Sequence, residues 1–504
     1  MSTAPIGAAA PRTATPPPAK ASGPRLLALD AFRGMDIALM FFVNLSASRA
    51  AFPEWFGHAG WNNGEHGYWL ADVVFPWFLF IVGCAIPFSM SGGRGREQTV
   101  PRRFVSAFRR ALVIYMLGIA IWIAKSAKGE TGTPITWTTF LHWDILPLIA
   151  LGYFVGVIVY HLPRWTQIVL FAAILWGKWY ALPDLTQTVG LDRAAWMKDR
   201  VDIEHSIRSL GPVGDWMRTL VDAKEWPEVA RILGVFAGWL GTAITQGLPA
   251  CAAVIGGVLT GEYLRNHDAS IKAKAGVLIG LGGVLCALAA AWAHPALGAM
   301  PFSKDFFTPT YVLFSVASGM VALGALVAIL DAWTLPRWMF SLIGAGLMAA
   351  SFGVCAWLID PSTDLGRSQL TSCAIALGMM FAVFVAWAVV DLLLLRDRPA
   401  KASFWVIYGS NAIAVYFLAE LTWTLFWMHF RVMGPGSFGS QFAFPALQVH
   451  WAAFAQEVLS IALTDRAAAE VGRGLGPWLA TGTYLMIYWI FCYELWRRRI
   501  FIKV

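Results

Sequence analysis

The segment WFGHAGWNNGEHGYWLADVVFPWFLFIVG, residues 55–83, joins a polar stretch to an apolar one. From Trp69 to Met90 the chain is almost wholly apolar, with Asp72 as its sole charged residue. A helix needs about 20 such residues to cross about 30 Å of hydrocarbon, and this run is long enough. Comparable apolar runs recur along the whole chain. The pattern predicts an all-α fold, a polytopic transmembrane helical bundle.

The composition is typical of the same class. Of 504 residues, 58% are hydrophobic and 13% are charged, against about 25% charged in soluble proteins. The 26 tryptophans suit membrane interfaces. The net charge of +8 comes from basic residues grouped in short loops, which is typical of membrane orientation, so no nucleic-acid partner is expected. The six cysteines lie in apolar segments without paired spacing, and we expect neither a disulfide framework nor a metal site.

We predict about twelve spans, and an even number puts both termini on one side. Basic residues are concentrated in alternate segments, including the block from Arg94 to Arg110 and the tail from Arg497 to Lys503. By the positive-inside rule both termini are cytoplasmic. The predicted spans are residues 28–48, 69–90, 105–124, 140–160, 165–182, 243–264, 274–294, 308–330, 337–358, 371–395, 404–427 and 478–496.

Two glycine pairs at small-xxx-small spacing, Gly257–Gly261 and Gly276–Gly280, permit close helix packing in the second half. An amphipathic helix is expected in the last long outer segment. The span assignment divides the chain into four regions. They are a disordered tail (1–24), a first transmembrane half with an outer loop at 49–68 (25–182), an extracytoplasmic cap segment (183–242), and a second transmembrane half with an outer loop at 428–477 (243–504).

The first span, LLALDAFRGMDIALMFFVN, carries charges near its cytoplasmic end. Asp30 and Asp36 each lie three residues from Arg33, so the three side chains can meet on one helix face. They could form a local ion pair that tethers the helix end. Alternatively, Arg33 and Arg25 could bind a polyanion, because guanidinium groups match phosphate geometry. Asn44, about 16 Å further along the helix, either bonds a neighbouring helix or faces a ligand.

The outer loop contains His58 and His66. Three interpretations are open: a metal site, although no helical HExxH spacing is present; histidines that merely lie at the interface; or a general base, because imidazole takes up protons near neutral pH. Asp72, just inside the second span, is costly to bury alone and is expected to orient a histidine or pair with a cation.

Three motifs together resemble a known family. LDAFRGMDIALMFFVN, HAGWN and ADVVFPWFLFIVGCAIPFSM, within residues 26–90, resemble heparan-α-glucosaminide N-acetyltransferase and its bacterial relatives. Looser matches are PFSKDFFTPTYVLFSVAS, YGSNAIAVYFLAE and the closing RRIFIKV. The resemblance implies transfer of an acetyl group from cytoplasmic acetyl-CoA, without a metal, to the amine of a glucosamine-like sugar across a bacterial inner membrane. Membrane lipid and a second copy in a homodimer are the further partners considered.

The resemblance also assigns roles to residues and makes 49–68 the catalytic loop. The expected site comprises catalytic His58, Asn44 and Asp72, acetyl-CoA-binding Arg25, Asp30, Arg33 and Asn411, and substrate-binding Trp61, Asn62 and Glu420. Departures from the family pattern leave the acceptor open: its GVLQR motif is DILPL from Asp144 here, Ala419 replaces a frequent histidine, and 337–358 and 371–395 look inserted.

Other readings of the same polar groups remain. A sugar permease for N-acetylglucosamine would use them as a binding site at the membrane midplane, although no inverted repeat is visible. A membrane O-acyltransferase of glycans would act on a hydroxyl group. Within the acetyltransferase reading, direct transfer and an acetyl-histidine intermediate are both compatible with His58.

Overall fold

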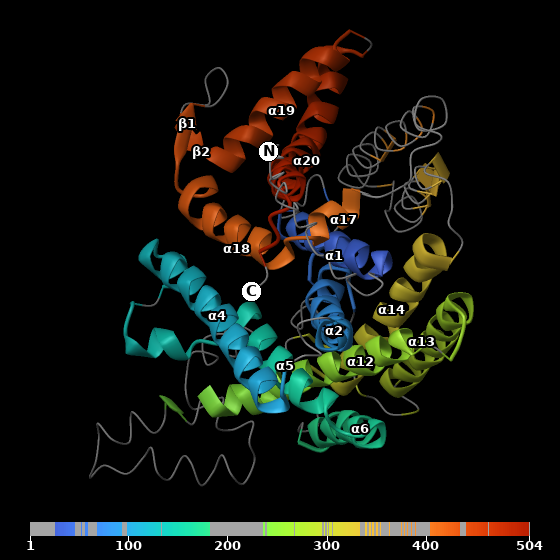
Figure 1. The fold of residues 1–504 in the computed structure, drawn as a ribbon. Helices are drawn as coiled ribbons and strands as arrows, with labels where there is room; N and C mark the ends of the chain where they lie inside the picture. The colour runs from blue at the N-terminus through green and yellow to red at the C-terminus, as the bar shows by residue number, and fades with distance from the viewer. Residues whose placement is uncertain are drawn as a thin grey trace, which may run out of the picture.

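The computed structural model is mostly helical (Figure 1). Its first half contains α1 (Leu27–Leu45), α2 (Leu70–Ser91), α4 (Val100–Ala127), the 3-10 turn η3 (Trp137–Leu141), α5 (Ile145–Tyr160) and α6 (Arg164–Ala181). The structure describes residues 26–45, 52, 56–58, 68–92, 98–132, 134–181, 235–236, 239–266, 268–294, 297, 300, 302–304, 306–332, scattered positions between 338 and 389, 404–433, 440–461 and 463–502.

The second half continues the helical pattern. Three of its elements are short π-helical segments that adjoin longer helices, and one pair of strands forms an antiparallel hairpin in which Arg431 pairs with Phe442. In chain order these elements are η4 (Ala243–Gly247), α12 (Leu248–Arg265), α13 (Ile271–Ala293), α14 (Pro309–Val327), η5 (Ala328–Ala332), α17 (Phe404–Gly409), α18 (Ala412–Thr422), η6 (Trp423–Trp427), β1 (Arg431–Met433), β2 (Ser440–Phe442), α19 (Ala443–Leu459) and α20 (Asp465–Arg497).

Five helical segments within the described residues are long and apolar enough to cross a membrane. They are Leu70–Ser91, Val100–Ala127, Trp239–Arg265, Ile271–Ala293 and Pro309–Ala332, and the shorter apolar helices are Ile145–Tyr160 and Ala412–Trp427. The predicted helical membrane class therefore agrees with the structure. The count of twelve spans and the cytoplasmic termini stay predictions, as do the tail, cap and inserted segments, which lie wholly or largely outside the described residues.

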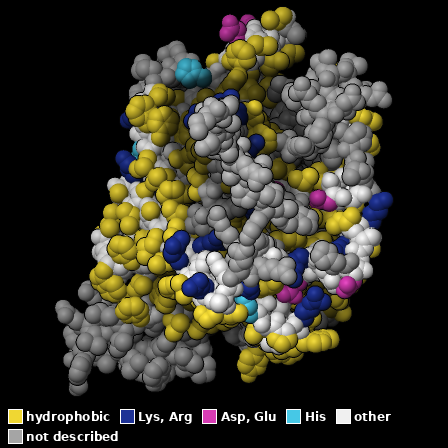
Figure 2. Space-filling model, viewed as in Figure 1, with side chains coloured by type: hydrophobic (Ala, Val, Ile, Leu, Met, Phe, Trp, Pro, Cys, Tyr) yellow, Lys and Arg dark blue, Asp and Glu magenta, His cyan; other side chains and the backbone are white. Residues whose placement is uncertain are grey.

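The outer surface of the bundle is apolar. On α4 and α6, Val105 is 69% exposed and Trp165 is 78% exposed. Hydrophobic side chains cover much of the face seen in Figure 2, and charged side chains form small groups between them. Apolar surface of this extent is unfavourable in water and is typical of a surface that contacts lipid or another protein.

Helix α1 lies in the middle of the bundle and packs at backbone distance against α17 (Figure 1). A Cβ atom at Gly34 would lie 1.9 Å from the Trp405 carbonyl oxygen, and one at Gly409 would lie 2.0 Å from that of Asp30. At the start of α1, the carboxylate of Asp331 accepts hydrogen bonds from the Leu27 and Ala28 amides at 3.2 and 3.0 Å. These contacts fix the axis on which Arg33 and Asn44 are placed.

Helices α2 and α12 pack equally closely. A Cβ atom at Gly257 would lie 2.1 Å from the Phe80 carbonyl oxygen, and one at Gly261 would lie 2.4 Å from that of Cys84. Close packing, which the spacing permits, is therefore present at this glycine pair. At Gly276 and Gly280 no described atom lies within 4 Å of an added Cβ atom, so among the described residues this pair packs against no partner. Small residues permit close packing but do not require a partner.

The last part of the chain forms an antiparallel helix pair, α19 and α20. Gly472 and Gly476 of α20 lie against the backbone of α19, where added Cβ atoms would come within 2.7 Å of the Ala452 carbonyl oxygen and 2.5 Å of the Gln448 carbonyl oxygen. The amphipathic helix expected in the outer segment 428–477 corresponds to α19. Helix α20 begins at Asp465, earlier than the predicted start at 478, so its first turns share that segment with α19.

Candidate functional site

His58 and Asp72 form a close pair at the start of α2. Asp72 occupies the third position of the helix, where one carboxylate oxygen accepts a hydrogen bond from the Trp69 amide at 3.1 Å. Its other oxygen lies 2.7 Å from Nδ1 of His58. Asp72 is 2% exposed, whereas the His58 side chain is 49% exposed. A carboxylate accepts only, so Nδ1 carries the proton and Nε2 keeps a lone pair that can accept one.

The surroundings of Asp72 hold the pair in place. The Tyr311 hydroxyl, on α14, donates to the Asp72 carbonyl oxygen at 2.9 Å. The Ala71 amide donates to the Gly57 carbonyl oxygen at 3.4 Å, which ties the loop to α2 directly before His58. A carboxylate fixed in this way orients His58 through its Nδ1 atom and leaves Nε2 toward the outside of the pair. The orienting role, one of the two considered for Asp72, matches this geometry.

An aromatic cluster anchors the loop that carries His58. Phe52 and Phe56 are buried and pack against Phe42 of α1 and Trp478 of α20. The Phe52 and Trp478 ring centroids are 4.5 Å apart, and those of Phe42 and Phe56 are 5.3 Å apart. Aromatic pairs at these distances are favourable beyond their buried area. The histidine is therefore held against α1, α2 and α20 together.

Lys304 is a site residue that the sequence alone did not single out. Its Nζ lies 3.3 Å from Nε2 and 3.4 Å from Nδ1 of His58. The residue falls within PFSKDFFTPTYVLFSVAS, a stretch noted above only as a loose family match. An ammonium group at this position can donate to Nε2 at rest, or to a negative charge that develops on a bound substrate.

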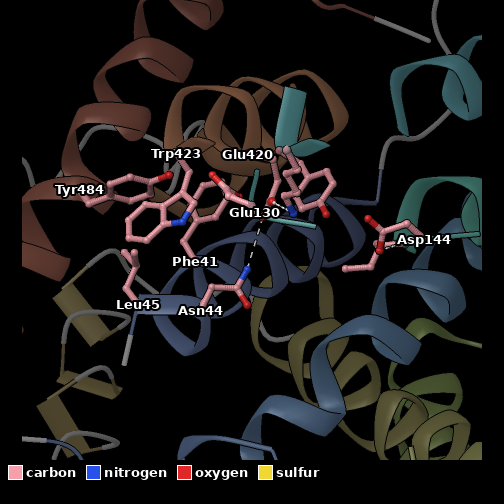
Figure 3. A pocket seen from close by; sticks show the side chains of 11 residues that line it. Phe41, Asn44, Leu45, Glu130, Asp144, Glu420, Trp423 and Tyr484 are labelled. Carbon is pink, nitrogen blue, oxygen red and sulfur yellow. Dashed lines mark hydrogen bonds and ion pairs between the residues drawn. The ribbon is translucent and has the colours of Figure 1, made fainter. Parts of the chain in front are cut away.

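Asn44 lines a cavity of about 340 Å³ at the same end of α1 (Figure 3). Its Nδ2 donates to Glu420 Oε1 at 3.5 Å, and Lys125 Nζ donates to Glu420 Oε2 at 3.2 Å. Asn44 thus bonds a neighbouring helix, α18, which is one of the two alternatives considered for it. It also lines the cavity, and contact with a ligand stays a prediction. The structure brings together Asn44 and Glu420, which are far apart in the sequence. The cavity lining also includes the acids Glu130 and Asp144 and the aromatic residues Phe41, Tyr416, Trp423 and Tyr484.

The residues expected to bind the donor lie elsewhere. Arg33 Nη1 is 3.5 Å from Asp30 Oδ1, and the Arg33 side chain is 24% exposed. Asp36 is buried, and neither of its carboxylate oxygens forms a hydrogen bond within the described residues, so it does not join that pair. Asn411 donates to the Ile500 carbonyl oxygen at 3.2 Å and accepts from the Ile502 amide at 2.8 Å.

The contacts of Asn411 bind the C-terminal segment to α18, and a role in donor binding stays a prediction. Arg25, Trp61, Asn62 and His66 lie outside the described residues. Among the residues that the structure does describe, no cluster of three or more metal-ligating side chains is present. This absence does not extend to His66, which lies outside the described residues.

The fold and the site define a class: a helical membrane protein with a close histidine–aspartate pair at the start of one of its long apolar helices. Residues 25–199 match the family model described as heparan-alpha-glucosaminide N-acetyltransferase, catalytic. The chain is also similar to two proteins of that name, at 33% identity over 132 residues for the Homo sapiens protein and 30% over 136 residues for the Mus musculus protein.

The similarity covers 26% and 27% of this chain, and 18% and 19% of the two relatives. The chain thus matches less than a fifth of the length of these curated relatives. The resemblance inferred from the motifs is confirmed by the family match over residues 25–199, which include His58, Asp72, Asn44 and Arg33.

Proposed function

We propose that this protein is a transmembrane acetyltransferase that moves an acetyl group from acetyl-CoA to the amine of a glucosamine-like sugar. The observation that carries the proposal is the 2.7 Å contact between His58 Nδ1 and the buried carboxylate of Asp72. It lies within the region that matches an acetyltransferase family. An oriented imidazole whose Nε2 can accept a proton is the group such a reaction needs, because a protonated amine is not a nucleophile.

The chemistry balances as follows. His58 Nε2 takes a proton from the sugar ammonium group, and the amine nitrogen forms a bond to the acetyl carbonyl carbon. The carbon–sulfur bond breaks, the sulfur leaves as thiolate and His58 returns a proton to it, and the second proton of the ammonium group goes to solvent. Asp72 stabilises the imidazolium that forms in between. Lys304 is positioned to donate to the developing oxyanion, an interaction typically worth about 10²–10³ in rate.

The donor would approach from the opposite end of α1. Acetyl-CoA supplies the thioester and carries phosphates, and Arg33, which is partly exposed at that end, would bind them together with Arg25. Arg33 precedes Asn44 by about 16 Å of helix, so a donor held at Arg33 has to extend along α1 to reach His58. This arrangement fits a protein of the bacterial inner membrane that has both termini on the cytoplasmic side and His58 on the extracytoplasmic side.

Proteoliposomes test the proposal directly. With acetyl-CoA inside and glucosamine outside, N-acetylated sugar should appear outside and free CoA inside. His58→Ala should lower the rate by about 10²–10⁴ while acetyl-CoA binding is retained. His450→Ala, at an exposed histidine of α19, is the matched control and should retain the wild-type rate. Transport of unmodified sugar without CoA release would instead identify a permease, and release of an O-acetylated sugar would identify an O-acyltransferase.

A further inference from the structure

We propose that the cavity beside Asn44 binds the acceptor as an ammonium ion, with the amine of a hexosamine held by the carboxylates of Glu130 and Asp144. The identity of this ligand as a substrate rests on the proposed acetyltransferase function, but its binding does not. The assignment makes Glu130 and Asp144 residues that capture the acceptor in a cavity that His58 does not line, so the amine has to pass from these carboxylates to His58 before it reacts. It also states what the cavity distinguishes: a cationic amino sugar from a neutral one.

The balance of charge in the cavity carries the argument. Three carboxylates, Glu130, Asp144 and Glu420, line it together with one ammonium group, that of Lys125. Lys125 Nζ lies 3.2 Å from Glu420, so these two charges offset each other. Glu130 and Asp144 remain. Lys125 also senses the charges of Glu130 and Asp144, but one ammonium group cannot balance three carboxylates, and the excess negative charge favours a positively charged ligand.

Two histidines lie near these acids. His429 Nδ1 lies 2.5 Å from the Thr424 carbonyl oxygen and 3.6 Å from Glu130 Oε1. Because a carbonyl oxygen only accepts, Nδ1 carries a proton and donates to Thr424. Burial lowers the pKa of His142, which lies close enough to Asp144 to sense its charge, so this ring is neutral at pH 7.

Asp144 is held by the backbone in a position to receive a ligand. It is the residue that precedes α5, and its Oδ1 accepts a hydrogen bond from the Ile145 amide at 2.8 Å. One oxygen suffices for this cap, and the other can accept from a ligand. Glu130 follows α4, and Thr424 donates to its Oε2 at 3.4 Å. Figure 3 shows both acids at the cavity together with Asn44 and Glu420.

The remaining walls suit a sugar ring. Tyr416, Trp423 and Tyr484 line the cavity from α18, η6 and α20. Aromatic faces attract cations and pack against apolar ring surfaces. The volume of about 340 Å³ lies at the lower end of the range of about 300–1,000 Å³ for small-molecule sites. One sugar unit therefore fits, with any further units of a chain outside.

The chemistry of the proposed reaction gives this arrangement a purpose. Acetylation converts the ammonium group into a neutral amide, and the attraction of Glu130 and Asp144 is lost with the charge. The pocket should therefore bind the acceptor more tightly than the acetylated product. Product release would follow from the same two carboxylates that bind the substrate.

Binding without turnover tests the inference. Purified full-length protein in detergent, without acetyl-CoA, is titrated with methyl β-glucosaminide, with its N-acetyl derivative and with methyl β-glucoside in a calorimeter. The wild type should bind the amine at least tenfold more tightly than either neutral sugar. Asp144→Asn keeps the helix cap, because asparagine caps as well as aspartate, and it should raise the Kd for the amine about tenfold, as should Glu130→Gln.

Glu494→Gln is the matched control, since this carboxylate is bonded to Arg498 at the far end of α20 and should leave binding within twofold. Equal affinity of the wild type for amine and amide, or an unchanged Kd in both cavity variants, would overturn the inference. If the amine binds and depends on Asp144 but no CoA is released in the liposome assay, the pocket stands and the acetyltransferase fails. If acetylation proceeds and Asp144→Asn leaves the KM for the amine unchanged, the pocket fails and the acetyltransferase stands.

Discussion

Replacement of Asp72 by asparagine separates an orienting role in catalysis from a purely structural one. The side chains have the same shape, and the amide oxygen can still accept from the Trp69 amide, which lies 3.1 Å from the carboxylate in the wild type. The start of α2 should therefore persist. What is lost is the negative charge 2.7 Å from His58 Nδ1, and with it the stabilisation of an imidazolium.

The size of the effect follows from the geometry. A hydrogen bond to a charged group contributes about 1.5–3 kcal/mol, and about 1.4 kcal/mol corresponds to a factor of ten in rate. His58 is 49% exposed, so water partly replaces the carboxylate and the lower half of this range applies. We expect kcat to fall about 10–40-fold, well short of the loss from His58→Ala, with the KM for acetyl-CoA within twofold.

Initial rates of CoA release in proteoliposomes measure kcat and KM for both substrates, and thermal unfolding of the purified protein checks the fold. Asp268→Asn is the matched control, since this acid lies in the exposed turn after α12 and should leave kcat unchanged. If Asp72→Asn unfolds near the wild-type temperature and retains full kcat, the carboxylate has no orienting role and His58 is not the base. A variant with a low melting temperature and normal kcat would make Asp72 a helix cap only.

Three further predictions concern the donor end, the helix packing and the topology. Arg33→Ala should raise the KM for acetyl-CoA at least tenfold and that for the sugar less than twofold, and steady-state kinetics with a reverse result would remove the arginine from the donor site. Gly257→Ala should lower the melting temperature by several degrees, because its Cβ would lie 2.1 Å from a backbone oxygen of α2 and overpacking costs about 1–3 kcal/mol. Gly276→Ala, with no described atom within 4 Å, should be neutral or stabilising. A cysteine at Gly60 should react with an impermeant thiol reagent outside intact cells and one at Gly95 should not, and the opposite labelling would reverse the proposed orientation.

Much of the fold and part of the site follow from local features of the sequence. Apolar runs predict the long helices because the length needed to cross hydrocarbon is fixed by the rise of the helix. The contact between His58 and Asp72 is also nearly local, since the two residues are 14 positions apart in the sequence and the aspartate sits in the first turn of α2. Motif resemblance points to the same histidine, which lies within the matched region 25–199.

Contacts between distant segments required the tertiary structure. Lys304 reaches His58 across 246 residues, and Glu420 meets Asn44 across 376. Hydropathy shows that a helix face avoids water, but lipid and a neighbouring helix cover such a face equally well. The sequence therefore does not tell Gly257, which packs against a partner helix, from Gly276, which has no described partner. The charge of the cavity is a property of the packing too: Lys125 offsets Glu420 and leaves the other acids to a ligand only because α4 and α18 are adjacent, and no spacing along the chain encodes that neighbour.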